Sequence, residues 1–199
     1  MAHLLEIATL YHGYQVAGGF FSARLKAFRD YLDFGAVRRV FDIGCGPGHI
    51  SRHIPAHVEY IGFDADARYI DYANRRFGRR GRFFARQFDA TATDDFGRPD
   101  LILLNGVLHH MDDGAVRAVA RDAARALNPG GVFFTLDGCF APDAHPIATY
   151  LLERDRGRHV REAAAYRDLI APEFEAVAMH VRADLSWVPY HFAILHARP

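Results

Sequence analysis

A glycine-rich turn that directly follows a short apolar segment constrains the fold more than any other feature of this sequence. The segment 39–43 has the pattern of a buried strand, and Gly44, Gly46 and Gly48 follow it. Glycines at alternate positions allow the backbone to turn tightly and to approach a ligand without a Cβ in between. A dinucleotide-binding turn has the spacing G-x-G-x-x-G, which would place its third glycine at His49. The sequence therefore predicts a strand-to-helix turn that either holds another kind of ligand or is only a tight turn.

Short apolar segments alternate with amphipathic ones along most of the chain. This alternation is typical of β-α-β units and predicts a mostly parallel sheet. The 199 residues are enough for one well-buried α/β core and too few for two. Apolar stripes at helical spacing indicate helices over 22–31 and 161–170, and in the two intervals that precede the third and fifth strands. Strands are expected over 39–43, 58–63, 82–88, 101–104 and 132–136, followed by two antiparallel strands over 176–181 and 186–197.

Three aspartates stand at the predicted ends of successive strands. Asp42 lies two residues before Gly44, Asp64 ends the second strand and Asp89 ends the third. Open α/β sheets bind ligands at the carboxyl ends of their strands, where an acid can accept hydrogen bonds from ribose hydroxyls or an adenine amine. Each aspartate has an alternative role as a helix N-cap. The three together, combined with the glycine turn, favour a nucleoside-binding site.

The composition narrows the range of partners. Lys and Arg number 24 and Asp and Glu number 24, and this neutral balance argues against a nucleic-acid substrate. The chain begins without a basic, long apolar leader and contains no apolar segment long enough to span a membrane, so a cytoplasmic protein is expected. Cys45 and Cys139 lack metal-type spacing, and Pro55 interrupts the pair His53 and His57, so no metal site is expected.

Several motifs in a characteristic order carry a resemblance to a known family. With these motifs in this order along the sequence, the chain resembles the class I S-adenosylmethionine-dependent methyltransferases, especially the small single-domain members. The resemblance implies a Rossmann-like three-layer α/β sandwich with a seven-stranded, mostly parallel sheet of order 3-2-1-4-5-7-6, in which strand 7 is antiparallel. It also implies one domain over 1–199, with a lid or helix region at 1–34, a cofactor-binding core at 35–137 and a substrate-side part at 138–199. The motifs are Val40–Gly48, Tyr60–Asp64, Phe88-Asp89, Leu104–His110 and Leu127-Asn128-Pro129-Gly130-Gly131.

The resemblance assigns cofactor contacts to the ends of the first four strands. The three glycines of the turn would face the amino-acid part of S-adenosylmethionine, and Asp42 would lie near its ammonium group. Asp64 would hold the ribose. Asp89 would meet the adenine amine, with Phe88 beside it. The end of the fourth strand, at Asn105 and Gly106, would approach the cofactor ammonium.

The chemistry of methyl transfer makes few demands on catalytic residues. The donor is already activated, so the protein chiefly aligns the reactants in a dry cavity. A general base is needed only when the acceptor arrives protonated. His109 and His110 follow the fourth strand and are the candidates for that base. Alternatively, one histidine packs in the core and the other hydrogen-bonds a loop.

The acceptor side is expected to come from the two ends of the chain. The candidates are aromatic residues and the arginines of the basic segment 154–161, which could clamp an anionic group. Alternatively, the tyrosines near the N-terminus belong to a terminal helix that packs on the sheet, and the arginines belong to a solvated charged turn. The aromatic residues near the C-terminus would then fill the core. The candidate residues are Tyr11, Tyr14, Arg154, Arg158, Trp187 and Tyr190.

These observations favour a small-molecule methyltransferase, with transfer to oxygen preferred over nitrogen, sulfur or carbon. An RNA-modifying enzyme on the same core is the first alternative, but residues 105–108 read Asn-Gly-Val-Leu in place of an Asn/Asp-Pro-Pro-aromatic motif. A non-catalytic partner subunit that binds S-adenosylmethionine is the second alternative. A nicotinamide-dependent enzyme is disfavoured by the glycine spacing. The oligomeric state stays open.

Overall fold

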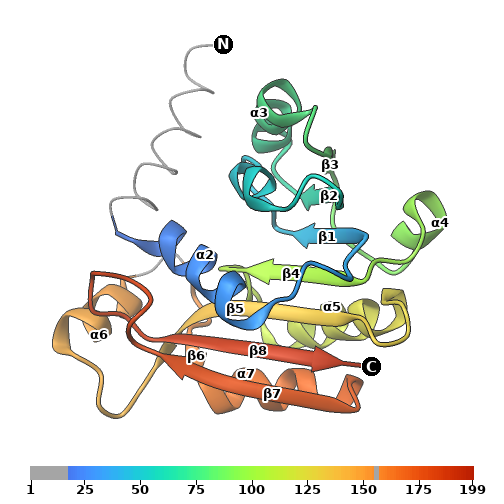
Figure 1. The fold of residues 1–199 in the computed structure, drawn as a ribbon. Helices are drawn as coiled ribbons and strands as arrows, with labels where there is room; N and C mark the ends of the chain where they lie inside the picture. Colours follow the sequence, from blue (N-terminus) through green and yellow to red (C-terminus); the bar gives the residue numbers. More distant parts are fainter. Residues whose placement is uncertain (1–17, 155–156) are drawn as a thin grey trace.

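The computed structural model describes residues 18–154 and 157–199, so Tyr11 and Tyr14 lie outside the described residues. One twisted sheet runs through the molecule with the order β3-β2-β1-β4-β5-β8-β7, and a short β6 pairs with the end of β5 (Figure 1). The strands are β1 (Arg39–Ile43), β2 (Glu59–Asp64), β3 (Arg82–Ala85), β4 (Leu101–Asn105), β5 (Val132–Phe140), β6 (Arg161–Glu162), β7 (Ala176–Arg182) and β8 (Phe192–Arg198).

This topology confirms the predicted sheet order. The first five strands pair in parallel, and β8 pairs antiparallel with both β5 and β7. The chain's last strand therefore lies between β5 and the strand before it in the chain, as the order 3-2-1-4-5-7-6 requires once β6, which pairs only with the end of β5, is set aside. Parallel strands in the middle of such a sheet are covered on both faces, which explains why every residue of β4 is buried.

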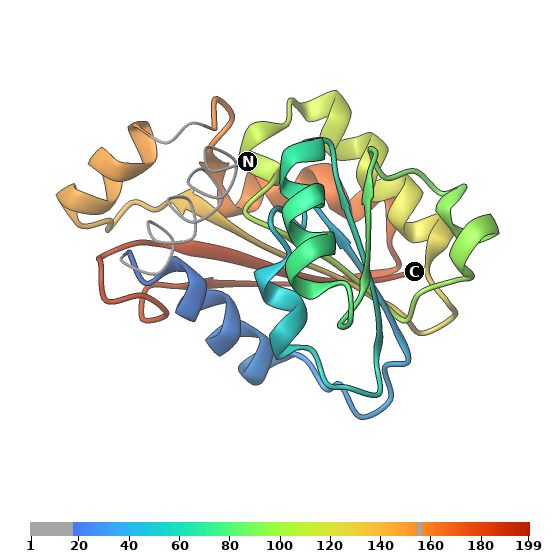
Figure 2. The ribbon, with the colours of Figure 1, turned by 90° about the horizontal axis from the view of Figure 1, so that it is seen from above.

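Helices cover both faces of the sheet (Figure 2). Buried residues of α2 (Phe20–Tyr31), α3 (Ala67–Phe77) and the 3-10 turn η1 (His49–His53) form one apolar cluster with one face. Residues of α4 (Ala92–Phe96), α5 (Asp113–Ala126) and α7 (Ala163–Ile170) form a second cluster with the other face. The result is a three-layer sandwich. The remaining elements are α6 (Pro146–Glu153) and the 3-10 turns η2 (Leu108–His110) and η3 (Ala171–Glu173).

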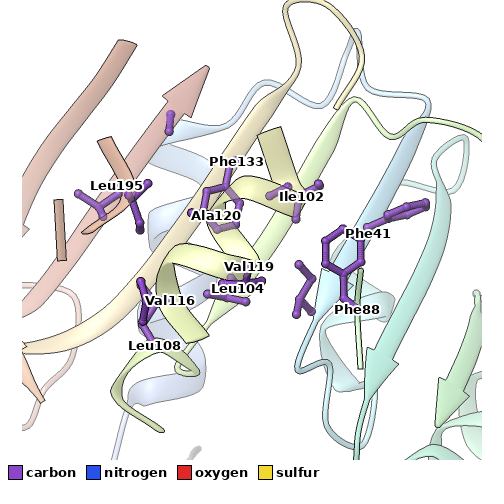
Figure 3. Close-up of a cluster of buried hydrophobic side chains, with 14 of the residues drawn as sticks. Phe41, Phe88, Ile102, Leu104, Leu108, Val116, Val119, Ala120, Phe133 and Leu195 are labelled. Atoms are coloured by element: carbon purple, nitrogen blue, oxygen red, sulfur yellow. The ribbon is translucent and has the colours of Figure 1, made fainter. Parts of the chain in front are cut away.

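The second cluster is packed from α5 onto the central strands (Figure 3). Val119 and Ala120 face Leu104, Ile102 and Phe133 across this interface. Burying each large aliphatic or aromatic side chain contributes about 1.5–3 kcal/mol to stability, so this face anchors the central strands firmly. The polar strand ends that form the site are therefore held on a rigid frame.

Local signals explain where the two best-predicted helices begin. The side chain of Asp66 accepts a hydrogen bond from the amide of Arg68 and caps α3. Asp112 accepts from the amide of Ala115 at 2.8 Å and caps α5. None of the described helices is long and apolar enough to cross a membrane.

Several predicted boundaries were wrong. The third strand ends at Ala85 rather than at residue 88, because the chain turns there and sends Phe88 into the core. The fifth strand continues to Phe140, because its end gains pairing partners in β8 and β6. The last strand begins at Phe192 rather than at residue 186. Residues 161–162 form β6, so the predicted helix 161–170 begins only at residue 163, and α4 and α6 were not predicted.

Candidate functional site

The turn after β1 is tight at both ends and open in the middle. Gly44, Gly46 and Gly48 all have left-handed φ values, of 70°, 53° and 77°. A Cβ on Gly44 would lie 2.5 Å from Val107, and one on Gly48 would lie 2.7 Å from Phe83. A Cβ on Gly46 would meet no atom within 4 Å. The outer glycines are therefore needed for packing, whereas Gly46 presents bare backbone to open space.

Asp64 at the end of β2 points at this turn. Its Oδ2 accepts from the amide of Gly46 at 2.9 Å, and its Oδ1 accepts from the amide of Asp66 at 2.8 Å. Burial raises the pKa of the Asp64 carboxyl, and these two amides oppose the shift. Each carboxylate oxygen has a second lone pair, so the group can still accept from two hydroxyls. The predicted ribose acceptor therefore has suitable geometry.

Asp42 lies deeper, at the end of β1. Its side chain is only 3% exposed, and its Oδ2 accepts a hydrogen bond from the phenol of Tyr60. Burial raises the pKa of Asp42 to about 7, while the Tyr60 hydrogen bond and the positive charge of Arg24 oppose the rise. A buried carboxyl with this pKa is poised to ionise when a cation approaches.

A cleft opens beside the turn, between α2, η1 and the end of β4. Asn105 lines it and is only 7% exposed, yet neither its Oδ1 nor its Nδ2 has a hydrogen-bond partner within the described part of the chain. Leaving such a buried amide unpaired costs about 1–3 kcal/mol, so the cleft is built for a polar ligand. The lining residues are Phe21, Arg24, Gly44, Cys45, Gly46, Pro47, His49, Ile50, Asn105 and Gly106.

These features fit S-adenosylmethionine. The unpaired amide of Asn105, the open backbone at Gly46 and the carboxylates of Asp42 and Asp64 supply donors and acceptors for its amino-acid head and ribose. When bound, this cofactor would supply a methyl group already activated on a sulfonium. The residues that would hold it come from three neighbouring strand ends, at the edge where such sheets bind ligands.

The two residues predicted to contact adenine, Asp89 and Phe88, lie in different surroundings. Asp89 is exposed and lies beyond the end of β3, so the expectation that it ends the third strand was wrong. Its carboxylate accepts from the amide of Thr91 at 2.9 Å and from the Thr91 hydroxyl, in the turn that leads into α4. Phe88 is buried between Phe41 and Phe63, with ring centroids at 6.2 and 5.8 Å. Hydrogen bonds within a local turn account for these contacts of Asp89, and core packing accounts for those of Phe88, while their contact with adenine stays a prediction.

His109 forms a buried dyad with Asp137. The two side chains are 12% and 1% exposed, and Nδ1 of the imidazole lies 2.7 Å from Oδ1 of the carboxylate. The backbone amide of His109 donates to the same oxygen at 3.2 Å. A carboxylate at Nδ1 selects the tautomer protonated there and leaves the basic lone pair on Nε2. Asp137 directly follows the predicted strand 132–136 but lies within β5, which continues to Phe140.

The dyad borders the cofactor cleft. Gly106, which lines the cleft, is so close that a Cβ on it would lie 3.9 Å from Cε1 of His109. His110 is exposed, and its ring centroid lies 4.1 Å from that of His109. Of the two predicted histidines, His109 is thus the one held by a buried carboxylate beside the cleft.

Residues near the end of the basic segment pack against the loop that carries His109. A Cβ on Gly157 would lie 2.1 Å from Cδ2 of His109, and the amide of His159 donates to the His109 carbonyl at 3.0 Å. The guanidinium of Arg161, 11% exposed, donates to the carbonyls of Leu108 and Met111 at 3.2 and 2.8 Å. Gly157 and Arg161 therefore hold the loop that carries His109.

The arginines predicted to clamp substrate lie on the surface. Arg154 and Arg158 are exposed, and the guanidinium of Arg154 stacks on the Tyr150 ring at 4.4 Å. The role of Arg154 and Arg158 in substrate binding stays a prediction.

The two aromatic candidates near the last strand differ in burial. Tyr190 is buried and packs edge-on against Phe20, with ring centroids 5.0 Å apart, so its position is that of a core residue. Trp187 is 74% exposed and lies against Gly19 at the start of α2. Their contact with an acceptor also stays a prediction.

Sequence reasoning missed three contributors to the site. Arg24 lines the cleft from α2, Gly157 packs on the His109 ring, and Arg161 holds the loop that carries it. The one available signal was the helical spacing of Arg24 from Phe21, an apolar residue that also lines the cleft. Nothing in the local sequence distinguishes Arg161 from its neighbouring arginines.

Comparison with known proteins supports this geometry. Residues 41–133 match the sequence model of the family described as "Methyltransferase domain". The chain is 28% identical over 177 residues to phosphoethanolamine N-methyltransferase 1 of Triticum aestivum, covering 81% of this chain and 34% of that protein. It is also 28% identical over 183 residues to aclacinomycin 10-hydroxylase RdmB of Streptomyces purpurascens, covering 85% of this chain and 48% of that protein. The chain thus spans a third to a half of the length of these relatives.

Solved structures share the fold. Human N-acetylserotonin methyltransferase, determined in complex with S-adenosylmethionine, matches 99% of this chain and 56% of its own with a TM-score of 0.71 at 16% identity. The N-methyltransferase NodS of Bradyrhizobium japonicum matches 88% of this chain and 94% of its own with a TM-score of 0.63 at 18% identity. In its glycine turn, its sheet order and the segment that matches the methyltransferase domain model, this chain is similar to the class I S-adenosylmethionine-dependent methyltransferases.

Proposed function

We propose that this protein transfers a methyl group from S-adenosylmethionine to a hydroxyl group of a small molecule, with His109 as the general base. The observation that carries the proposal is the buried His109–Asp137 dyad beside the cofactor cleft. A hydroxyl is a weak nucleophile while it keeps its proton, so an acceptor of this kind needs a base. A preformed thioether or carboxylate acceptor would need none.

The strand ends position the cofactor for this reaction. Asp64 accepts from the ribose hydroxyls, and the open backbone at Gly46 allows the amino-acid part to approach. Asp42 attracts the ammonium group, and Asn105 gains the partners that it lacks. Holding donor and acceptor in line removes much of the entropic barrier to displacement.

The dyad accepts the proton of the acceptor hydroxyl group. As the acceptor oxygen forms its bond to the methyl carbon and the carbon–sulfur bond breaks, Nε2 of His109 takes the hydroxyl proton. Asp137 stabilises the resulting imidazolium through the hydrogen bond at Nδ1. The segment from Gly157 to Arg161 holds the loop and limits movement of the ring.

The comparisons support a small-molecule acceptor without distinguishing oxygen from nitrogen. One relative is named as an N-methyltransferase and another as a hydroxylase. An amine acceptor arrives as an ammonium near neutral pH and would use the same base, so the acceptor atom has to be measured. The neutral charge of the chain also favours a small molecule over RNA.

The test is methyl transfer from S-adenosylmethionine labelled in its methyl group to panels of phenols, aliphatic alcohols and amines, with an RNA pool as a separate arm. We expect a labelled phenol or alcohol ether. His109→Gln should lower the rate by about a hundredfold or more while leaving affinity for S-adenosylhomocysteine within a few-fold. His110→Gln is the matched control and should retain most of the activity, because its side chain is exposed.

Three outcomes would contradict the proposal. Labelling of RNA alone or of amines alone would assign a different acceptor. Equal activity in His109→Gln and the wild type would show that His109 is not the general base. Failure to bind S-adenosylhomocysteine would show that the protein does not use S-adenosylmethionine.

A further inference from the structure

Arg24 brings a positive charge into the cofactor cleft from the helix that precedes the sheet. It lies on α2 and lines the cleft together with Gly46, Asn105 and Gly106. Its Nη2 would be 3.0 Å from a Cβ on Gly106, so the guanidinium lies directly over the backbone at the end of β4. The side chain is half-buried. Nothing in the sequence motifs accounts for this arginine.

Other partly buried arginines of the fold pair with acidic side chains or, as Arg80 does, donate to backbone carbonyls. Arg161 pairs with Asp113 at 2.7 Å, and Arg39 pairs with Glu59 at 2.7 Å. In the described part of the chain, by contrast, no carboxylate forms an ion pair with Arg24. A guanidinium taken partly out of water without a partner is costly, and arginine is well shaped to bind a carboxylate through two hydrogen bonds.

The charges around the cleft match one kind of ligand group. Asp42 is close enough to Arg24 for the guanidinium to lower the pKa of its carboxyl, yet the two do not form an ion pair. A negative and a positive side chain thus border the same turn at separate points. The unpaired amide of Asn105 supplies a further donor and acceptor in the same cleft. An ammonium and a carboxylate on one carbon atom would complement this arrangement.

We propose that Arg24 binds the carboxylate of the amino-acid part of the cofactor, opposite the ammonium that Asp42 attracts. The inference rests on the proposed use of S-adenosylmethionine and assigns to α2 a direct part in cofactor recognition. Arg24 is then a binding residue that acts through a charge-assisted, two-pronged hydrogen bond. A purely structural role would instead change the affinity of the cleft for every such ligand alike.

The test compares two ligands that differ only in this carboxylate. S-adenosylhomocysteine carries it, and 5′-(3-aminopropyl)thioadenosine lacks it but keeps the ammonium, thioether and adenosine. Affinities are measured by titration calorimetry on the whole chain, without turnover. The wild type should prefer S-adenosylhomocysteine by about tenfold or more, because a charged hydrogen bond is lost with the carboxylate.

Variants of Arg24 test whether this side chain causes the preference for S-adenosylhomocysteine. Arg24→Gln should bind S-adenosylhomocysteine about tenfold or more weakly and the decarboxylated ligand within about twofold of the wild type. Arg24→Lys should keep part of the preference, since it retains the charge without the fork. Arg29→Gln is the matched control, because Arg29 lies on the same helix, is exposed and pairs with Asp30 at 2.9 Å. It should leave both affinities unchanged.

The outcomes separate this inference from the proposed function. Binding of neither ligand by the wild type would overturn the proposed function and this assignment with it. Equal affinity of the wild type for both ligands would overturn the assignment alone, and this comparison holds even if Arg24→Gln fails to fold. Equal losses for both ligands in Arg24→Gln would replace carboxylate binding with a structural role for the Arg24 side chain.

Discussion

The phenol of Tyr60 donates a hydrogen bond to the carboxyl group of Asp42, and both side chains are buried at the start of the glycine turn. The two residues lie on adjacent strands, β2 and β1, where Tyr60 pairs in register with Val40 and Asp42 with Gly62. Burial raises the pKa of Asp42 to about 7, and the Tyr60 hydrogen bond holds it below what burial alone would produce. Ionisation of Asp42 therefore occurs near neutral pH, where it affects both stability and ligand binding.

Cofactor affinity should depend on pH through Asp42. With a pKa of about 7, this carboxyl is mostly neutral at pH 6 and mostly ionised at pH 8. Affinity for S-adenosylhomocysteine should rise between these values by up to about tenfold, because only the ionised form attracts the ammonium. Asp42→Asn should weaken binding and flatten the profile, as measured by calorimetry. A rising profile that persists in Asp42→Asn would assign it to another group.

The stability of the ligand-free protein should change in the opposite direction. The folded-state pKa of Asp42 lies above the reference value of 3.8, so the unfolded chain loses this proton first as pH rises. The carboxyl therefore increasingly destabilises the fold between about pH 4 and pH 7. Asp42→Asn should raise the melting temperature relative to the wild type at pH 7.5 and much less at pH 4. A similar difference at both pH values would contradict the shifted pKa.

Removal of the Tyr60 hydroxyl should move the binding profile to higher pH. Tyr60→Phe keeps the ring and its packing but deletes the hydrogen bond that favours the ionised carboxylate. The midpoint of the affinity profile should therefore rise, whereas affinity well above that midpoint should recover. Tyr69→Phe is a control outside this pair. An unchanged midpoint would show that the phenol does not tune Asp42.

The glycines of the turn should separate binding from folding. Gly46→Ala and Gly48→Ala both place a side chain in left-handed backbone, at a cost of about 1–2 kcal/mol. The new methyl group enters the open cleft at position 46, but at position 48 it meets Phe83 at 2.7 Å. Gly46→Ala should thus chiefly lower ligand affinity, and Gly48→Ala should chiefly lower the melting temperature. Reversal of this pattern would contradict the cleft assignment.

Arg161 should support catalysis without contributing to cofactor affinity. Arg161→Met keeps an apolar stem but loses the donors to the carbonyls of Leu108 and Met111 and to Asp113. Looser placement of His109 should lower the methyl-transfer rate by about tenfold or more, because small misplacements of a base are costly. S-adenosylhomocysteine affinity should change little. Arg167→Met, which removes an exposed arginine paired with Asp168, is the control. A loss confined to cofactor affinity would contradict this positioning role.

Short-range patterns predicted most of the frame. The apolar β4 segment, the stripe on α3 and the cap at Asp112 depend on neighbours a few residues away, so their sequence is sufficient to indicate them. The boundaries that were wrong depend on distant partners. The end of β5 extends because β8 and β6 pair with it, and Phe88 leaves its strand because the core around Phe41 and Phe63 accepts it.

The sequence alone determined the parallel sheet, the ligand-binding turn and the carboxylate at Asp64, because each is written in a contiguous segment whose spacing reflects backbone geometry. Only the tertiary structure decided which histidine meets Asp137, which arginine holds its loop and that Arg24 enters the cleft. These contacts join elements far apart in the chain, and their distances depend on how helices pack on the finished sheet. A linear pattern of residue types carries no measure of that packing.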